Sequence, residues 1–419
     1  MYALGYLGIS IFFQTTVKWY QYFYSPPELN QGGYQSLIPL GFVGLAMIIA
    51  RIFDGIADPL VAYYSDRSKN KKGRRIPFIF IGSFPLALSF ILLWFPPVEG
   101  VSIINFIYLT FILSLFFIFF TVVVGPYLAL IGEISKTNKE RINLTMMQGI
   151  TQILGVMIAE AGSGALINFY NFKIMGIVLG LLALFTILLT PLFVKEDPAN
   201  INTQQVNMSK SIKMTIANKD FLFYLISYSA VWFGINTLTI SMPYIFEVLL
   251  KSSAETSGYV IAGAFILALL FSPFLPKISL TFGKKLTLQI ASLMFALILF
   301  LIGLFGTVFP ITAAAGIIIL SGIPLSVIFI VPNAMIADIA EVDGIRNGIK
   351  REGMFFGAQG LIIKIIIGLS SLVTPLIFQV FGSNPGQYLG LQIVGPLAGV
   401  LIIFSLYFLR KYSLAEKRE

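Results

Sequence analysis

Three ionisable side chains, Arg51, Asp54 and Asp58, lie in the middle of one hydrophobic stretch of the sequence. On a helix, the i, i+3 and i+7 spacing projects all three from one face. Two carboxylates one turn apart repel each other and therefore favour a shared cation or proton. We interpret Asp54 and Asp58 as a coupling-ion site. The alternative is a static buried network in which Arg51 and Lys364 neutralise both acids, although buried ion pairs are poor stabilisers.

Other charged residues also fall inside hydrophobic segments. Lys364 lies about a dozen residues into its segment, near mid-membrane at roughly 1.5 Å per residue. It is a candidate for attracting a substrate carboxylate or phosphate, or for pairing with the two acids when no ion is bound. Lys18 lies among aromatic residues, which predicts that it snorkels to the membrane interface. Glu160 is expected deeper in the membrane, where it could line a cavity.

These residues must be positioned by membrane-spanning helices. The chain of 419 residues is 57% hydrophobic and only 11% charged, a composition typical of a polytopic all-α membrane protein. The first segment lacks a basic n-region and a cleavage site, so we expect a retained helix rather than a signal peptide. Twelve transmembrane helices are predicted, at about 2–24, 37–64, 74–95, 103–132, 142–166, 174–194, 221–249, 257–276, 286–307, 311–340, 352–381 and 388–409.

The basic residues predict the orientation of these spans. With the N-terminus in the cytoplasm, 23 of the 28 lysines and arginines fall in cytoplasmic segments and 2 in external loops. This asymmetry predicts that both termini are cytoplasmic. It also accounts for the net charge of +9, so we expect no nucleic-acid partner. The predicted location is the plasma (cell inner) membrane.

Several kinds of chemistry are excluded by residue type. The sequence has no cysteine and no histidine, which excludes disulfides, Cys/His metal sites and histidine acid–base catalysis. We find no phosphate-binding glycine loop, nucleophile elbow or metalloprotease helix. The prediction is that the protein is not an enzyme and needs no cofactor beyond a coupling ion, Na⁺ or H⁺.

The chain divides into two similar halves. Its longest polar stretch, 195–220, separates them, and matching acidic and basic residues follow corresponding segments of each half. We predict an N-terminal six-helix bundle (1–194), a cytoplasmic linker (195–220), a C-terminal six-helix bundle (221–410) and a cytoplasmic tail (411–419). Duplicated halves of this kind suggest a transporter with its site between them.

Several motifs in order resemble the major facilitator superfamily, and more closely its glycoside–pentoside–hexuronide:cation symporter family, which is typified by melibiose permease and includes sodium-dependent lysophosphatidylcholine symporters. The motifs are Arg51-x-x-Asp54-x-x-x-Asp58-Pro59, Asp66-Arg67 with Gly73-Arg74-Arg75, Gly125-Pro126-Tyr127 with Glu133 and Arg141, and Asp338 with Arg351-Glu352-Gly353 and Lys364. The resemblance implies the twelve-helix major facilitator fold, cation-coupled uptake by alternating access, and a monomer.

The resemblance also implies site residues. The family's cation ligands correspond to Asp54, Asp58 and Thr121, whereas Ala57 replaces a polar ligand and leaves sodium and a proton both open. The family's sugar-binding residues are not retained, since Val124 and Leu128 replace an aspartate and an aromatic residue. Candidate substrate or coupling residues are Lys364, Arg51, Gln14, Gln148, Gln152, Asn236 and Gln359; each of the amides could instead serve only to join helices.

We predict that charged residues on the cytoplasmic side form and break contacts as the transporter changes state. Networks that form in one state and break in another would support alternating access; the alternative is that these charges only anchor the loops. The candidates are Asp66, Arg67, Arg74, Arg75, Glu133, Arg141, Asp338 and Arg351.

The sequence therefore predicts a cation-coupled secondary symporter that imports a small organic solute, with a sugar or glycoside as the first expectation. The alternatives are a symporter or flippase for an amphipathic anionic solute such as a lysophospholipid, a lipid scramblase, and a non-transporting membrane receptor. The expected partners are a small-molecule substrate and the lipid bilayer.

Overall fold

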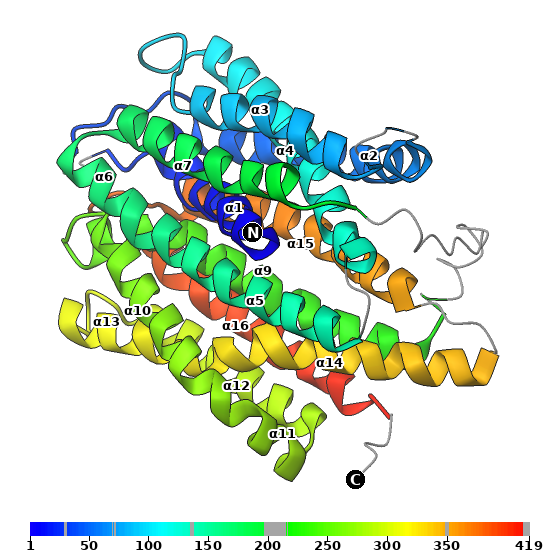
Figure 1. Ribbon diagram of the computed structural model, residues 1–419. Coiled ribbons are helices and arrows are strands. Elements are labelled where there is room, and N and C mark those ends of the chain that lie inside the picture. The colour runs from blue at the N-terminus through cyan, green and yellow to red at the C-terminus, as the bar shows by residue number, and fades with distance from the viewer. Residues whose placement is uncertain are drawn as a thin grey trace. The chain divides into compact units, whose positions relative to one another are not determined.

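The computed structural model describes residues 1–28, 32–68, 70, 73–134, 138–196, 215, 217–347 and 352–413. These residues fold almost entirely into helices (Figure 1). They group into two compact units, residues 1–203 with 253–262, and residues 204–252 with 263–419.

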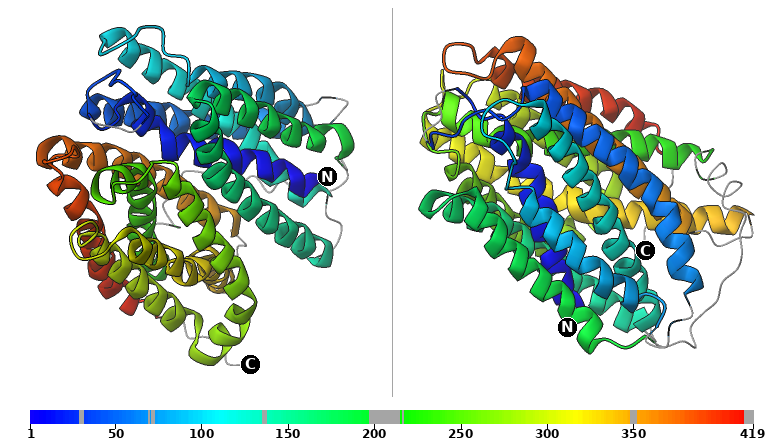
Figure 2. Two further views of the ribbon diagram at one scale, coloured as in Figure 1. Left: turned by 90° about the vertical axis from the view of Figure 1, so that its left-hand side faces the viewer. Right: turned by 90° about the horizontal axis from the view of Figure 1, so that it is seen from above.

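In its described residues, the first unit contains seven complete α-helices, one π-helical turn and the start of α10. Helix α1 packs against α5 and α7, α4 packs against α2 and α3, and α3 also contacts α7 (Figures 1 and 2). The elements are α1 (Tyr2–Tyr24), α2 (Leu40–Arg67), α3 (Ile76–Leu92), α4 (Ile103–Ile134), α5 (Asn138–Met157), the π-helix η1 (Ile158–Gly162), α6 (Ser163–Phe169) and α7 (Phe172–Phe193).

In the second unit, α9 packs against α15 and α16, and α12 packs against α14 and α16. The start of α10 groups with the first unit and its remainder with the second. The elements are α9 (Lys219–Tyr244), the π-helix η3 (Ile245–Leu249), α10 (Thr256–Phe271), the 3₁₀-helix η4 (Ser272–Phe274), α11 (Leu275–Phe282), α12 (Lys284–Ile302), α13 (Ile311–Leu320), α14 (Gly322–Asn347), α15 (Glu352–Phe381) and α16 (Leu389–Arg410).

Helix boundaries follow from local sequence. Asn171 and Asn218 precede α7 and α9, and each side-chain oxygen accepts a hydrogen bond from a backbone N–H in the first turn, 2.9 Å from Ile174 N and 3.1 Å from Phe221 N. Asparagine is favoured at such N-cap positions because it satisfies an otherwise unpaired donor. Inside the predicted span 257–276, Pro273 cannot donate a backbone hydrogen bond, and a short 3₁₀ turn interrupts the helix there.

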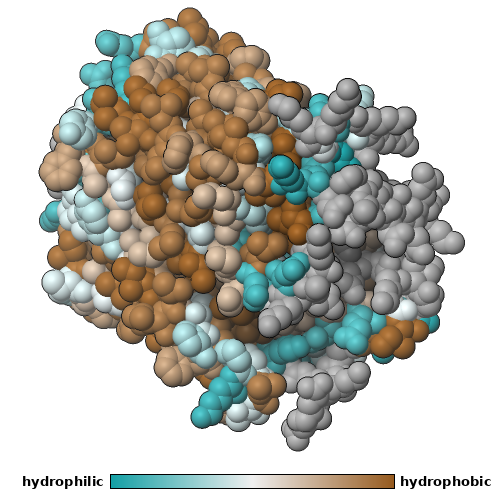
Figure 3. Space-filling model, in the orientation of Figure 1, coloured by the Kyte–Doolittle hydropathy of each residue, from teal (hydrophilic) through white to brown (hydrophobic). Residues whose placement is uncertain are grey.

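The helices bury polar residues and expose apolar ones. On α2, Asp54 is 0% exposed, whereas Ile52 and Ile56 are 59% and 54% exposed. Much of the face shown in Figure 3 is likewise apolar. This inside-out pattern is the one expected of helices that face lipid.

Ten helical segments of the described residues are long and apolar enough to cross a membrane, and Ile76–Leu92 is a shorter apolar helix. The predicted all-α membrane class is confirmed. The count of twelve spans and their division into two six-helix halves remain predictions.

Candidate functional site

The predicted cation ligands meet where α2 packs against α4. Asp54 and Thr121 are buried, and Asp58 is partly exposed. The Thr121 hydroxyl oxygen lies 2.5 Å from Asp54 Oδ1 and 3.2 Å from Asp58 Oδ1. A hydroxyl has one hydrogen to donate, so it can serve only one of these carboxylates at a time. Three oxygens are thus held together in a cluster that has more negative charge than hydrogen-bond donation from Thr121 can offset.

One backbone carbonyl of α2 lacks its usual intrahelical donor. Pro59 has no N–H to donate to the carbonyl of Gly55, four residues earlier in α2. The space that a side chain would occupy at Gly55 is open, with no atom of the described residues within 4 Å. Ala57 is buried beside the acids and adds no side-chain oxygen. The possible ligands are therefore two carboxylates, one hydroxyl and a carbonyl, all of which suit a hard cation or a proton.

Arg51 lies beside this cluster and interacts with both acids. Its Nη1 donates to Asp54 Oδ2 at 3.2 Å, and its guanidinium carbon lies 3.8 Å from the ring centroid of Phe117 and 5.5 Å from that of Phe13. Both contacts are favourable cation–π geometries. Among the described residues, its Nε and Nη2 are buried without a hydrogen-bond partner. Unpaired buried donors are costly, so this guanidinium can readily accept a different partner.

A second buried ion pair joins α1 to the π-helix η1. Lys18 Nζ lies 2.7 Å from Glu160 Oε2, and both side chains are 0% exposed. Gln14 donates to the other carboxylate oxygen, Oε1, at 2.7 Å. The prediction that Lys18 snorkels to the interface is therefore wrong, because Glu160 offers a fully buried partner. The sequence showed both residues, but nothing in it indicated that they pair.

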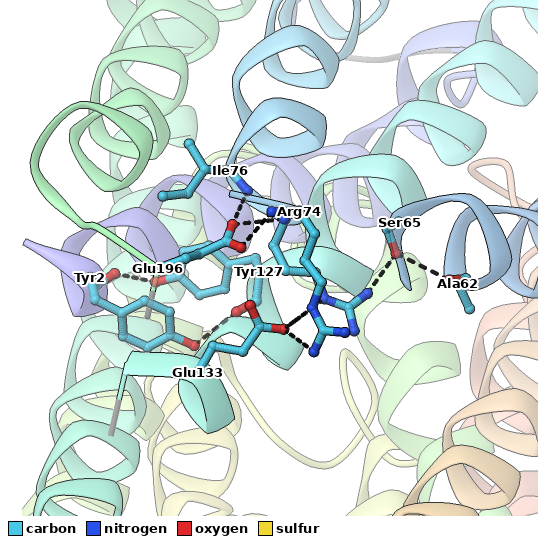
Figure 4. A network of polar contacts seen from close by, with 9 residues as sticks. Tyr2, Ala62, Ser65, Arg74, Ile76, Tyr127, Glu133 and Glu196 are labelled. Atoms are coloured by element: carbon cyan, nitrogen blue, oxygen red, sulfur yellow. Dashed lines mark hydrogen bonds and ion pairs between the residues drawn. The ribbon is translucent and has the colours of Figure 1, made fainter. Parts of the chain in front are cut away.

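Charged residues near the ends of α2, α3 and α4 form a network (Figure 4). Glu133 Oε1 lies 2.7 Å from Arg74 Nη2 and 3.2 Å from Arg75 Nε. Arg75 also donates to the Ser65 hydroxyl at 2.6 Å. Three of the eight predicted gating residues therefore meet, although their role in gating remains a prediction.

Sequence reasoning missed Glu196, which follows α7 and completes this network. Its carboxylate accepts backbone hydrogen bonds from Arg74 N, Arg75 N and Ile76 N at 2.6, 2.7 and 2.5 Å (Figure 4), where the N-terminal end of α3 favours negative charge. Burial raises the pKa of Glu196, the three N–H donors lower it, and nearby Glu133 raises it, with a net increase. An acid just after the sixth predicted span, near the basic loop residues, was the available signal.

Gly73 is required for this arrangement. Its φ of +107° lies in a region that favours glycine. A Cβ at this position would also clash with the Glu196 carboxyl group. The glycine of the Gly73-Arg74-Arg75 motif therefore permits both the turn and the close approach of the carboxylate.

The second unit pairs its predicted charges differently. Asp338 Oδ2 lies 2.6 Å from Lys284 Nζ. Arg351, which the sequence grouped with Asp338, lies outside the described residues. Lys364 is partly exposed on α15.

The remaining polar candidates have varied surroundings. Asn236 is buried and donates to Ser370 Oγ at 2.7 Å and Ser371 Oγ at 3.0 Å, which joins α9 to α15. Gln359 accepts from Tyr224 at 2.6 Å, Gln148 accepts from Tyr2 at 3.2 Å, and Gln152 is exposed. The side chains of Asp66, Arg67 and Arg141 also lie outside the described part of the structure.

Solved structures show which class of protein this fold defines. The chain aligns over its whole length with a D-xylose–proton symporter (TM-score 0.70, 16% identity, 100% of this chain and 98% of that one). It aligns similarly with the nucleoside transporter NupG (TM-score 0.68, 13% identity, 98% of each chain). At these identities the likeness concerns the fold alone.

The family is shown by sequence. The family model described as MFS/sugar transport protein matches residues 1–409, and the chain belongs to this family. It is 24% identical over 415 residues to the uncharacterized symporter YnaJ of Bacillus subtilis (strain 168), covering 90% of this chain and 84% of that protein. It is 29% identical over 136 residues to sodium-dependent lysophosphatidylcholine symporter 1 of Xenopus tropicalis, covering 32% and 26%. The major facilitator resemblance is thereby confirmed, as is the prediction that the protein is a transporter rather than an enzyme.

Proposed function

We propose that this protein is a cation-coupled symporter that imports a small organic solute, with Asp54, Asp58 and Thr121 as the cation site. Twelve spans in two halves, 1–194 and 221–410, would exchange between outward-open and inward-open states. The linker 195–220, the tail 411–419 and both termini would lie in the cytoplasm, with the protein in the plasma membrane as a monomer.

The observation that carries the proposal is the convergence of the Asp54, Asp58 and Thr121 oxygens within hydrogen-bond distance of one hydroxyl. An acidic cluster inside a membrane protein is unfavourable unless a positive charge joins it. Arg51 is one such charge, and its Nη1 contacts Asp54. Na⁺ or a proton would be another, held by the three converging oxygens.

Arg51 gives the site a means of coupling. A cation bound between Asp54 and Asp58 would compete with the guanidinium for Asp54. Arg51 would then shift its remaining donors toward other groups on the cavity side of α2. A ligand changes a conformational equilibrium only through different contacts in the two states, and this exchange of partners provides such a difference.

For the solute, a sugar or glycoside is the first proposal. It rests on the family description, MFS/sugar transport protein, and on relatives such as the lactose permease of Lactobacillus delbrueckii subsp. bulgaricus, 22% identical over 416 residues. The second candidate is an amphipathic anionic solute. It is favoured by the similarity to lysophosphatidylcholine symporters and by Val124 and Leu128, which make the equivalent of the sugar site less polar.

Transport in proteoliposomes tests the proposal. Purified protein would be given an inward Na⁺ or H⁺ gradient with labelled melibiose, lactose or lysophosphatidylcholine as probes. The expected result is gradient-driven accumulation of one probe, lost in Asp58→Asn and at least partly retained in Asp58→Glu, which keeps the charge.

Two results would contradict the proposal. Accumulation by Asp58→Asn equal to that of the wild type would remove the cation site. Lipid movement without any gradient would favour the scramblase alternative. Specific binding of a probe by folded protein that transports none of the probes would favour the receptor alternative.

A further inference from the structure

The Lys18–Glu160 pair has a polar setting that the proposed cation site does not use. Gln14, Lys18 and Gln21 are spaced i, i+4 and i+7 and so share one face of α1. Gln14 and Lys18 bind the two oxygens of the Glu160 carboxylate, each at 2.7 Å. Gln21 is 0% exposed, and neither atom of its amide has a hydrogen-bond partner among the described residues.

One further α1 side chain, at the edge of this face, is unsatisfied in the described part of the chain. The hydroxyl of Thr15, three residues before Lys18, is buried there without a hydrogen-bond partner. Buried polar groups are rarely left unsatisfied, and bound water ordinarily serves them when protein groups do not. The polar atoms around the ion pair are therefore suited to holding water, which carries protons.

The backbone around Glu160 departs from an α-helix. Glu160 lies at the centre of the π-helical turn η1, whereas the segments before and after it are α-helical. The Ser163 hydroxyl contacts the Ala159 and Glu160 carbonyls, and Trp19 Nε1 donates to the same hydroxyl at 2.7 Å. Single π-turns of this kind are rare and occur frequently at functional sites.

Lys18 also interacts with a second carboxylate. Glu255, just before α10, is partly exposed and attracts the ammonium group of Lys18 electrostatically, less strongly than Glu160 does. Tyr34 likewise interacts electrostatically with Glu255. The start of α10 is tightly packed here, because a Cβ at Gly258 would clash with the Glu160 carbonyl and lie 2.8 Å from Lys18 Nζ. Lys18 is thus within electrostatic reach of one fully buried acid and one partly exposed acid.

We propose that Glu160 is a proton-exchange site and that Lys18 switches between Glu160 and Glu255. When the ammonium group moves to Glu255, an O–H bond of a hydronium ion breaks, its proton forms an O–H bond at Oε2 of Glu160, and water is left. The ammonium group keeps its three protons, so the site gains one proton and one positive charge. The reverse step releases the proton and restores the ion pair. Gln14 remains bonded to Oε1 in both states.

The switch avoids the main cost of opening a buried pair. A buried charge left without a partner is strongly unfavourable. Here the departing ammonium reaches another carboxylate, and the carboxylate left behind is neutralised by its proton. The exchange is independent of the identity of the coupling ion at Asp54 and Asp58; only its use during transport rests on the proposed function.

Infrared difference spectroscopy of the full-length protein in lipid bilayers tests this inference without a substrate. The signal is the carbonyl stretch of protonated carboxyl groups, recorded as the pH is lowered stepwise. The variant is Lys18→Met with Glu160→Gln, because removing both charges together leaves no unpaired charge to unfold the protein. Tryptophan fluorescence melting confirms that each variant is folded.

The expected result is a carboxyl signal that titrates in the wild type and is lost in the double variant. Asp58→Asn should keep this signal and lose only the contribution of Asp58 itself. In Glu255→Gln the signal should appear only at lower pH, because Lys18 has lost its second partner. Identical titrations of the wild type and the double variant would overturn the proton site. A wild-type titration in Glu255→Gln would overturn the switch. Neither result depends on whether Asp58→Asn abolishes transport, so the two proposals can fail separately.

Discussion

Two charge clusters in the first unit differ in how the donors of the base are paired. In the Lys18–Glu160 cluster, the Lys18 ammonium group and the Gln14 amide bind both oxygens of one carboxylate. In the Arg51 cluster, the Thr121 hydroxyl lies within hydrogen-bond distance of two carboxylates, and two guanidinium nitrogens have no hydrogen-bond partner among the described residues. Burial alone therefore does not identify an ion site. The ion pair of the first cluster must open before that cluster takes up a charge, whereas in the second cluster three oxygens already converge on a place for a cation.

The largest expected effect comes from removing the base of the Lys18–Glu160 cluster. Lys18→Met leaves Glu160 buried without a counter-charge, which should destabilise the protein by about 3–5 kcal/mol. The double variant Lys18→Met with Glu160→Gln should recover most of this loss. Thermal unfolding followed by tryptophan fluorescence measures both. A single variant as stable as the double variant would show that the two side chains are not coupled.

Removing the base of the Arg51 cluster should instead strengthen the binding of a cation. Arg51→Met removes the competitor of the cation for Asp54, so Na⁺ or proton binding should tighten, by a factor on the order of ten if one charge-assisted hydrogen bond is lost. Equilibrium binding at constant ionic strength measures the change, with Arg51→Lys as the control that keeps the charge. Weaker cation binding in Arg51→Met would mean that Arg51 supports the site instead of competing for it.

Substitutions at Thr121 test whether its hydroxyl is a cation ligand or whether the side chain only fills space. Thr121→Val keeps the shape of the side chain but removes its oxygen, and should weaken cation binding by about 1–1.5 kcal/mol, or roughly tenfold. Thr121→Ser keeps the hydroxyl and should bind nearly as the wild type does. If valine and serine have the same effect, the hydroxyl is not a ligand.

Gly73 tests the network at the ends of α2, α3 and α4, away from both clusters. Gly73→Ala should destabilise the protein by about 1–2 kcal/mol, because alanine disfavours the positive φ and its Cβ would clash with the Glu196 carboxyl group. Gly316→Ala is the matched control, since nothing lies within 4 Å of its Cβ position in the described structure. Equal melting temperatures for the two variants would contradict this role of the turn.

The smallest expected effect is the pH dependence that comes from Glu196. Its raised pKa means that the folded state binds the proton more tightly than the unfolded state does. The associated stability is present below the ordinary pKa of glutamate and is lost as the pH rises through the raised value. The wild type should therefore lose more stability than Glu196→Gln over this range, as measured by melting temperatures at a series of pH values. Parallel pH profiles would contradict the assignment.

The fold class and the residues of the candidate cation site could be predicted from sequence. Hydrophobic segments and the spacing of Arg51, Asp54 and Asp58 are local patterns, and the resemblance supplied Thr121 from a different helix. What sequence did not reveal was pairing between distant helices. Lys18 and Glu160 are 142 positions apart, and Arg74 and Glu196 are 122 apart, so only packing brings them together. The same limit applies to the pairing of Asp338 with Lys284, which are 54 positions apart.

We expect above all that Asp54 and Asp58 of α2 bind a cation. Equilibrium uptake of ²²Na⁺, together with proton release or uptake in weakly buffered solution, can be measured on the purified wild type, Asp58→Asn and the double variant Lys18→Met with Glu160→Gln. We predict that Asp58→Asn loses cation binding while the double variant retains binding at the α2 site. Cation binding that is unchanged in Asp58→Asn would contradict this claim.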